Sequence, residues 1–84
     1  MPSSSRQIHV RFFAVLREQA GRSALAVDTT ASTPAELYAE LQAKHALIFP
    51  VSLLRVSLNE RYAEMTAPLA AGDRVVFIPP VAGG

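Results

Sequence analysis

The stretch TPAELYAELQAKH, residues 33–45, carries the clearest local structural signal in the chain. Thr33 is suited to be the N-cap of a helix, Pro34 fits the first helical position, and Glu36 stands where a carboxylate reaches back to the cap. Pro50 lies shortly beyond the stretch and cannot continue a regular helix. The pattern therefore predicts a helix that begins at Pro34 and ends near residue 45.

One face of this predicted helix is apolar. Leu37 and Leu41 lie four residues apart, so their side chains share a face. Ile48 continues the same line just past the expected end of the helix. We therefore expect all three side chains to point into the core.

The first strand is predicted well before the helix. Ile8, Val10 and Phe12 alternate with His9 and Arg11, which is the period of two typical of a strand with one buried face. The three apolar side chains are expected to point inward.

A short helix and a second strand are expected between the first strand and the main helix. Residues 14–20 have helical spacing, and Gly21 suits the left-handed conformation that commonly ends a helix. Leu25 and Val27 then alternate with smaller or polar residues, which indicates a strand that ends near Asp28.

The remaining strands are expected after the main helix. Leu54, Val56 and Leu58 alternate with polar residues, and a turn is predicted at Asn59-Glu60. Gly72 provides the positive φ of a second tight turn. The expected strands are residues 54–58, 61–65 and 74–78.

This order of elements predicts an α+β fold of the β-grasp, or ubiquitin-like, type. One long helix packed across a mixed sheet of four to five strands, with an additional short helix, is a natural two-layer solution for a chain of this size. By analogy with that fold, the first and last strands pair in the middle of the sheet. We divide the chain into a flexible lead-in at residues 1–7, the domain at 8–78 and an extended tail at 79–84.

The last segment, FIPPVAGG at residues 77–84, points most directly to function. Two prolines end the pairing of the last strand and favour an extended path, and two glycines without Cβ atoms come after them. Such a stalk would bring an unhindered carboxylate at Gly84 into a narrow catalytic tunnel. The tail residues that would thread the tunnel are Pro79, Pro80, Val81, Ala82 and Gly83.

Composition excludes several other functions. The 84 residues are 50% hydrophobic with a net charge of +1, which is typical of one folded domain. The basic residues are scattered, so nucleic acid and membrane are not expected as partners, and the cytoplasm is the expected location. Cysteine is absent, which rules out thiolate chemistry on a side chain. His9 and His45 lack ligand spacing, so no metal is expected.

Phe13, Tyr62 and Ile78 are candidates for a partner interface. If the strands that carry or flank them adjoin, these side chains form an exposed apolar patch near the root of the tail. If the main helix covers that face of the sheet, they belong to the core instead. The sequence leaves this choice open.

The chain resembles the MoaD-like branch of the ubiquitin-like sulfur carriers, the family of the small subunit of molybdopterin synthase. The resemblance covers roughly residues 8–84. It rests on Phe12-Phe13-Ala14 with Arg17-Glu18 and Gly21, on Leu58-Asn59, and on Leu69, Gly72-Asp73, Val75 and the segment Pro79 to Gly84.

The resemblance implies a mechanism and partners. A ubiquitin-activating-like adenylyltransferase would use ATP to adenylate the Gly84 carboxylate, and a sulfur donor protein would convert it to a thiocarboxylate. The loaded tail would enter the large subunit of molybdopterin synthase and give its sulfur to precursor Z, a cyclic pyranopterin monophosphate. The family expectation is a heterotetramer, no cofactor bound by this chain, and catalytic groups supplied by the partners.

Two alternatives remain at this point. The same fold also serves carriers for thiazole, cysteine or tRNA thiolation and protein modifiers. Thiazole carriers are usually shorter and lack the front motif at residues 12–18. The other alternative is a β-grasp interaction module with an inert tail, which the Pro-Pro and Gly-Gly segment disfavours.

Overall fold

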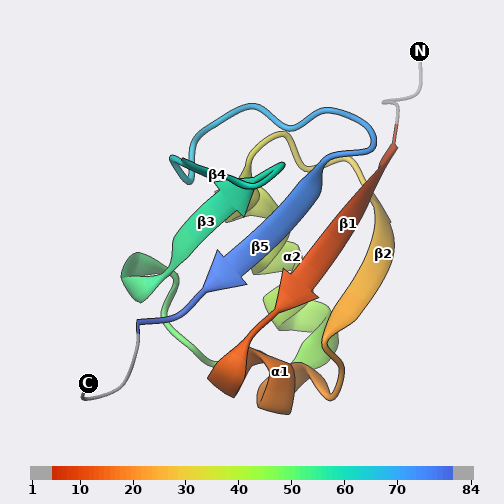
Figure 1. Cartoon of the computed structure of the whole chain (residues 1–84). Coiled ribbons are helices and arrows are strands. Elements are labelled where there is room, and N and C mark those ends of the chain that lie inside the picture. Colours follow the sequence, from red (N-terminus) through yellow and green to blue (C-terminus); the bar gives the residue numbers. More distant parts are fainter. Residues whose placement is uncertain (1–4, 81–84) are drawn as a thin grey trace.

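The computed structural model describes residues 5–80 and shows a sheet with a long helix packed on one of its faces (Figure 1). The elements are β1 Arg6–Phe12, α1 Ala14–Ala20, β2 Ala24–Thr29, α2 Pro34–His45, the 3-10 turn η1 Val51–Leu53, β3 Arg55–Leu58, β4 Arg61–Ala63 and β5 Arg74–Ile78. β1 begins two residues before the expected start, and β4 ends two residues before the expected end. None of the helices in residues 5–80 is long and apolar enough to cross a membrane.

The five strands lie in the order β2-β1-β5-β3-β4. β1 and β5 are parallel and central, with His9 opposite Arg74 and Phe12 opposite Phe77. Every other neighbouring pair is antiparallel. The predicted pairing of the first and last strands is therefore confirmed, and with α2 crossing one face the architecture is the β-grasp.

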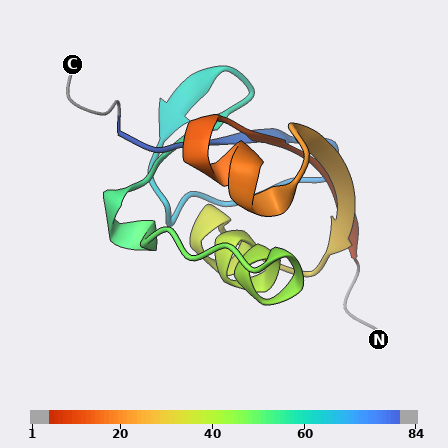
Figure 2. The same ribbon diagram turned by 90° about the horizontal axis from the view of Figure 1, so that it is seen from below.

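The core lies between α2 and one face of the sheet (Figure 2). Every second residue of the central strands is buried there, as the alternation of Ile8, Val10 and Phe12 predicts. The helix contributes Tyr38, whose ring centroid lies 5.1 Å from that of Phe77. The other strand and helix residues of the core are Leu16, Leu37, Leu41, Val56 and Val75.

Tyr38 also connects α2 to the loop that follows it. Its side chain is fully buried, and its hydroxyl donates to the carbonyl oxygen of Phe49 at 2.8 Å. Burial raises the pKa of the Tyr38 phenol above its ordinary value, so the group remains a neutral donor. The hydrogen bond satisfies a hydroxyl that would otherwise be costly to bury.

The expectation for Ile48 is wrong. Its side chain is 79% exposed, whereas its neighbour Leu47 is buried. The reason is Ala46, which ends α2 in the left-handed conformation with φ 56° and breaks the helical periodicity. The backbone N–H of Ile48 instead donates to Gln19 Oε1 of α1 at 2.9 Å.

The start of α2 confirms the predicted cap and changes one of its partners. Thr33 Oγ1 accepts the backbone N–H of Glu36 at 3.2 Å. The carboxylate of Glu36 accepts the backbone N–H and the hydroxyl of Ser32, at 2.9 and 3.0 Å, instead of the N–H of Thr33. These hydrogen bonds from Ser32 hold the pKa of Glu36 below its ordinary value.

We expect Thr33→Ala to destabilise the fold by about 1 kcal/mol, because it removes the acceptor for one N–H at the helix start. In a domain of this size that loss lowers the melting temperature by roughly 4–8 °C. Thermal unfolding followed by circular dichroism measures it. Thr30→Ala, an exposed threonine before the cap, is the matched control. Equal melting temperatures for the two variants would contradict a stabilising role of the cap.

Side-chain hydrogen bonds join the β3–β4 turn to the turn that precedes β5. Asn59 has φ 52° in the β3–β4 turn, and its side chain accepts the N–H of Arg74 and donates to Asp73, both at 2.9 Å. The other carboxylate oxygen of Asp73 accepts the N–H of Ala70 at 2.8 Å. Gly72 has φ 85°, as predicted for this turn. The start of the central strand is thereby tied to the neighbouring hairpin.

Candidate functional site

The central strand β5 leads into the C-terminal segment. β5 runs toward the end of the sheet where β1 ends and α1 lies (Figure 1). After Ile78, the side chain of Pro79 is buried and that of Pro80 is exposed. A strand hydrogen-bonded on both sides is a rigid base for the segment that it leads into. Val81, Ala82, Gly83 and Gly84 lie outside the described residues, so their role as a threading tail remains a prediction.

The helix covers the face of Ile8, so the opposite face of the sheet is not core. Within residues 5–80 no helix lies over that opposite face (Figure 2). Phe13 is 44% exposed, Tyr62 is 78% exposed, and Ile78 is half-buried. The structure therefore decides the choice that the sequence leaves open, in favour of exposure. We call this surface the open face.

The candidate interface residues come from different parts of the open face. Ile78 is on β5, and Phe13 follows the end of the adjacent strand β1. The strand of Tyr62 does not adjoin β5, because β3 lies between them and places Ser57 between Val76 and Tyr62. Tyr62 therefore lies on the outer edge strand of the group.

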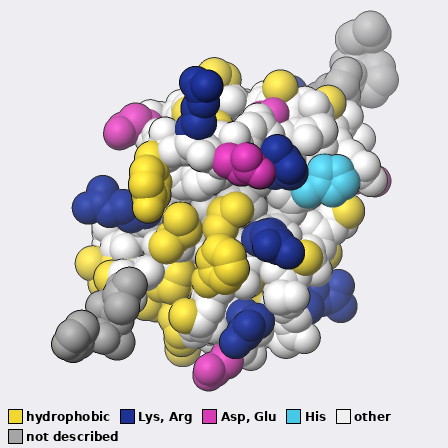
Figure 3. Space-filling view, viewed as in Figure 1, with side chains coloured by type: hydrophobic (Ala, Val, Ile, Leu, Met, Phe, Trp, Pro, Cys, Tyr) yellow, Lys and Arg dark blue, Asp and Glu magenta, His cyan; other side chains and the backbone are white. Residues whose placement is uncertain are grey.

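Val76 is a member of this group that the candidate residues omit. It is half-buried and faces outward on β5, and together with Phe13 it lines a hollow in the open face. Val76 stands two residues before the candidate Ile78, so the strand period of two puts both side chains on one face, and this spacing could have identified it. Hydrophobic side chains gather on this face, with basic side chains around them (Figure 3). We define the open-face patch as Phe13, Tyr62, Val76 and Ile78.

Further exposed apolar side chains lie in the loop after α2. Ile48, Val51 and Leu53 are 79%, 39% and 55% exposed. The exposure of Val51 and Leu53 could not be predicted from the sequence, because a short 3-10 turn has no apolar periodicity to read. They enlarge the apolar surface at η1, near the end of the sheet where β5 ends (Figure 1).

The described residues offer an exposed apolar patch and no cluster of metal-ligating side chains. Among residues 5–80, no group of three or more His, Cys, Asp or Glu side chains is placed to hold a metal ion. The open face combines an apolar patch with basic side chains at its border (Figure 3). Such a surface suits association with another protein.

The fold and this surface define a class. A sheet in the order β2-β1-β5-β3-β4, with one long helix across one face and an exposed apolar patch on the other, is that of a ubiquitin-like protein. The ThiS family model matches residues 10–84. The chain belongs to the ThiS family.

Two curated relatives have the same name, Molybdopterin synthase sulfur carrier subunit. The relative from Escherichia coli is 35% identical and the one from Haemophilus influenzae is 32% identical, each over 80 residues. Each match covers 92% of this chain and 99% of the relative. The similarity therefore extends over the whole domain.

Two solved structures show the same fold. SAMP1 from Haloferax volcanii matches with a TM-score of 0.77 and 27% identity, covering 93% of this chain and 99% of the other. A chain in the complex of subunits 1 and 2 of molybdopterin-converting factor from Helicobacter pylori matches with a TM-score of 0.65 and 29% identity, with the same coverage. The predicted β-grasp fold and the resemblance to sulfur carriers are thus confirmed.

Proposed function

We propose that this chain is the sulfur-carrier subunit of molybdopterin synthase. The observation that carries the proposal is the similarity to two molybdopterin synthase sulfur carrier subunits over 99% of their length. The reacting group is the carboxylate of Gly84, which receives sulfur and donates it to precursor Z bound by the large subunit. The Helicobacter complex of subunits 1 and 2 supports a large-subunit partner.

The chemistry requires two partner reactions before the sulfur is donated. A carboxylate is a poor electrophile, so an adenylyltransferase first joins it to AMP from ATP and releases pyrophosphate. Sulfide-level sulfur delivered by a sulfur donor protein then attacks the acyl carbon. The new C–S bond replaces the C–O bond to AMP, AMP leaves, and a thiocarboxylate results. The glycines at positions 83 and 84 lack side chains that would hinder either active site. This chain provides the reacting carboxylate, and its partners provide nucleotide binding and catalysis.

The described domain would position the tail in each partner. β5 is bonded to a strand on both sides, so the segment after Ile78 starts from a fixed point. The open-face patch lies beside that point and would bury apolar area against the large subunit. Docking through the patch would leave the tail free to enter the active site. A heterotetramer of two small and two large subunits is part of the proposal.

The first experiment is the intact mass of the protein after incubation with an activating enzyme, ATP and a sulfur source. We expect a species heavier by the exchange of one oxygen for sulfur, formed only with ATP. Addition of the large subunit with precursor Z should return the mass to its initial value and yield molybdopterin. An unmodified mass would overturn the sulfur-carrier function. A thiocarboxylate that the large subunit does not consume would indicate another sulfur-transfer pathway.

We expect Phe13→Asp to weaken the complex with the large subunit by about ten-fold or more, since exposed aromatic anchors often dominate an interface. The fold should be unharmed, because Phe13 is the N-cap of α1 without a side-chain cap bond, and Asp is a favourable N-cap residue. Isothermal titration calorimetry gives the affinity and thermal unfolding checks the fold.

The matched control for this variant is Ile48→Asp, which places the same charge on an exposed apolar residue in the loop after α2. We expect Ile48→Asp to bind within about two-fold of wild type, as most residues outside a hot spot do. Equal affinities for Phe13→Asp and wild type would remove Phe13 from the interface.

A further inference from the structure

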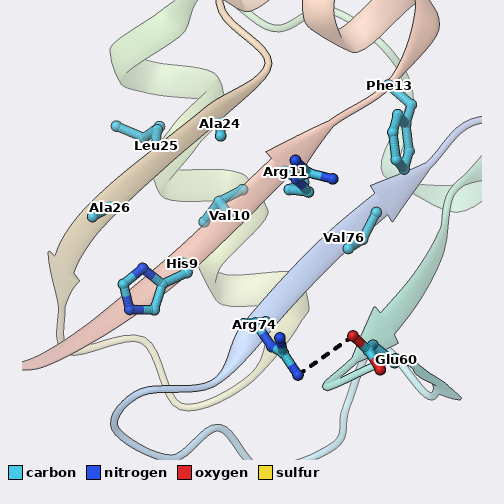
Figure 4. Close-up of a pocket in the computed structure, with 10 residues that line it drawn as sticks. All are labelled: His9, Val10, Arg11, Phe13, Ala24, Leu25, Ala26, Glu60, Arg74 and Val76. Atoms are coloured by element: carbon cyan, nitrogen blue, oxygen red, sulfur yellow. Dashed lines mark ion pairs between the residues drawn. The ribbon is translucent and has the colours of Figure 1, made fainter.

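The open face has a hollow of about 720 Å³, and the open-face patch supplies only part of its lining (Figure 4). It lies over β1, between β2 and β5. The side chains drawn around it include the apolar Phe13 and Val76 and the basic Arg11 and Arg74. Arg11 is paired with Val76 across the strands and Arg74 lies farther back along β5, so the hollow combines apolar contact area with two cationic side chains.

The strand register explains why a hollow forms here. One row across the sheet places Ala26 beside His9, and the next places Ala24 beside Arg11. The alanines of the edge strand β2 are too short to fill the space next to the long side chains of β1. On the other side, Arg74 lies opposite His9 on β5. A partner side chain would have room above the alanines and contact with the arginines.

The charge around this hollow is mainly positive. Among the residues of 5–80 that line it, Glu60 is the acid, and it pairs with Arg74 at 3.5 Å. Both side chains of that pair are well exposed, at 60% for Arg74 and 77% for Glu60, so solvent screens it and it contributes little. In the same range of residues, Arg11 has neither an ion pair nor a side-chain hydrogen bond. Arg55, opposite Ile78 on β3, adds a further positive charge to the open face.

We propose that this hollow binds a carboxylate side chain of the large subunit, with Arg11 as the main contact. The proposal rests on the proposed function and specifies the partner chemistry of its docking surface. A guanidinium offers a planar pair of donors that matches a carboxylate. Burial of Phe13 and Val76 at the same contact would exclude water and strengthen the attraction. The space above the alanines of β2 fits an acidic side chain, and Phe13 and Val76 fit apolar side chains next to it in the same partner segment.

Charge reversal tests the proposal. Arg11→Glu and Lys44→Glu each change the net charge of the chain from +1 to −1, since each replaces one positive charge by one negative charge. Lys44 lies on α2, in the layer opposite the open face. We expect Arg11→Glu to weaken binding to the large subunit by about ten-fold or more, and Lys44→Glu by about two-fold or less. Calorimetry at low and high salt should also show a weaker salt dependence for Arg11→Glu.

Chemical cross-linking tests contact directly. Lys44 is the only lysine of the chain, so Arg11→Lys introduces a second side-chain amine at a chosen place. A carbodiimide joins an amine to a carboxylate only when the two are in contact. In the complex formed by Arg11→Lys, we expect mass spectrometry to find residue 11 joined to an Asp or Glu of the large subunit. A complex that forms without this cross-link would overturn the proposal.

The outcomes separate this proposal from the function on which it rests. Equal effects of Arg11→Glu and Lys44→Glu would show that only overall charge matters, and would overturn the role of the hollow. If the wild-type protein binds the large subunit and transfers sulfur, and Arg11→Glu does both equally well, only the proposed role of the hollow is overturned. Wild-type protein that does not bind the large subunit overturns the proposed function and the hollow together.

Discussion

Deletion of Gly84 is expected to abolish sulfur transfer completely while leaving the domain folded. The deletion exposes the carboxylate of Gly83 one residue earlier, about 3.3 Å short of the position that the activating enzyme requires. Catalytic steps that depend on near-attack geometry tolerate little displacement of this kind. The proposed reaction therefore depends on the last residue even though the fold does not.

The measurement compares the deletion with wild type in the reconstituted system of activating enzyme, ATP, sulfur source and large subunit. The mass of the thiocarboxylate and the formation of molybdopterin are the readouts, and circular dichroism reports folding. Gly84→Ala is the matched variant, because it keeps the chain length and adds only a Cβ atom. Normal sulfur transfer by the deletion would contradict the role of Gly84, and unfolding of the deletion would indicate a packed terminus.

Phe77→Ala is expected to cost about 3–5 kcal/mol of the free energy of unfolding. The side chain of Phe77 is fully buried on β5 and packs against the ring of Tyr38 on α2. Removing it leaves a cavity between the sheet and the helix that the surroundings fill only partly. A domain of this length is stable by only about 4–12 kcal/mol, so the loss is a large fraction of the total.

Urea denaturation measures this loss of stability. The control variant changes Val76, the residue that precedes Phe77 on β5. Val76 faces outward and is half-buried, so Val76→Ala should cost about 1 kcal/mol or less. The two variants differ in the face of β5 that they change. Equal losses for Phe77→Ala and Val76→Ala would contradict the assignment of the open face and show that both faces of β5 are packed.

Local signals in the sequence determined most of the elements. Alternation at Ile8, Val10 and Phe12 requires only neighbouring residues, as does the cap at Thr33, and both are present in the structure. The turns at Asn59 and Gly72 likewise depend on residues that accept positive φ at low cost. A two-layer arrangement of one long helix and several strands then leaves few folds for a chain of this size.

The inward side of β5 could not be read from the sequence. Val75 and Phe77 on one face, and Val76 and Ile78 on the other, are all apolar, so alternation along this central strand is uninformative. The burial of Val75 and Phe77 depends on where α2 packs. The same dependence decided that Phe13 and Ile78 form an interface candidate and do not belong to the core.

By itself, the sequence determined the strand periods, the helix cap and the Gly-Gly segment, because each of these depends on residues that are neighbours in the chain. Only the tertiary structure decided which face α2 covers, that β3 separates Tyr62 from β5, and that Ile48 points outward. It also placed Ala24 beside Arg11 and so formed the cationic hollow. These features depend on contacts between distant segments, whose register is set by packing of the whole domain.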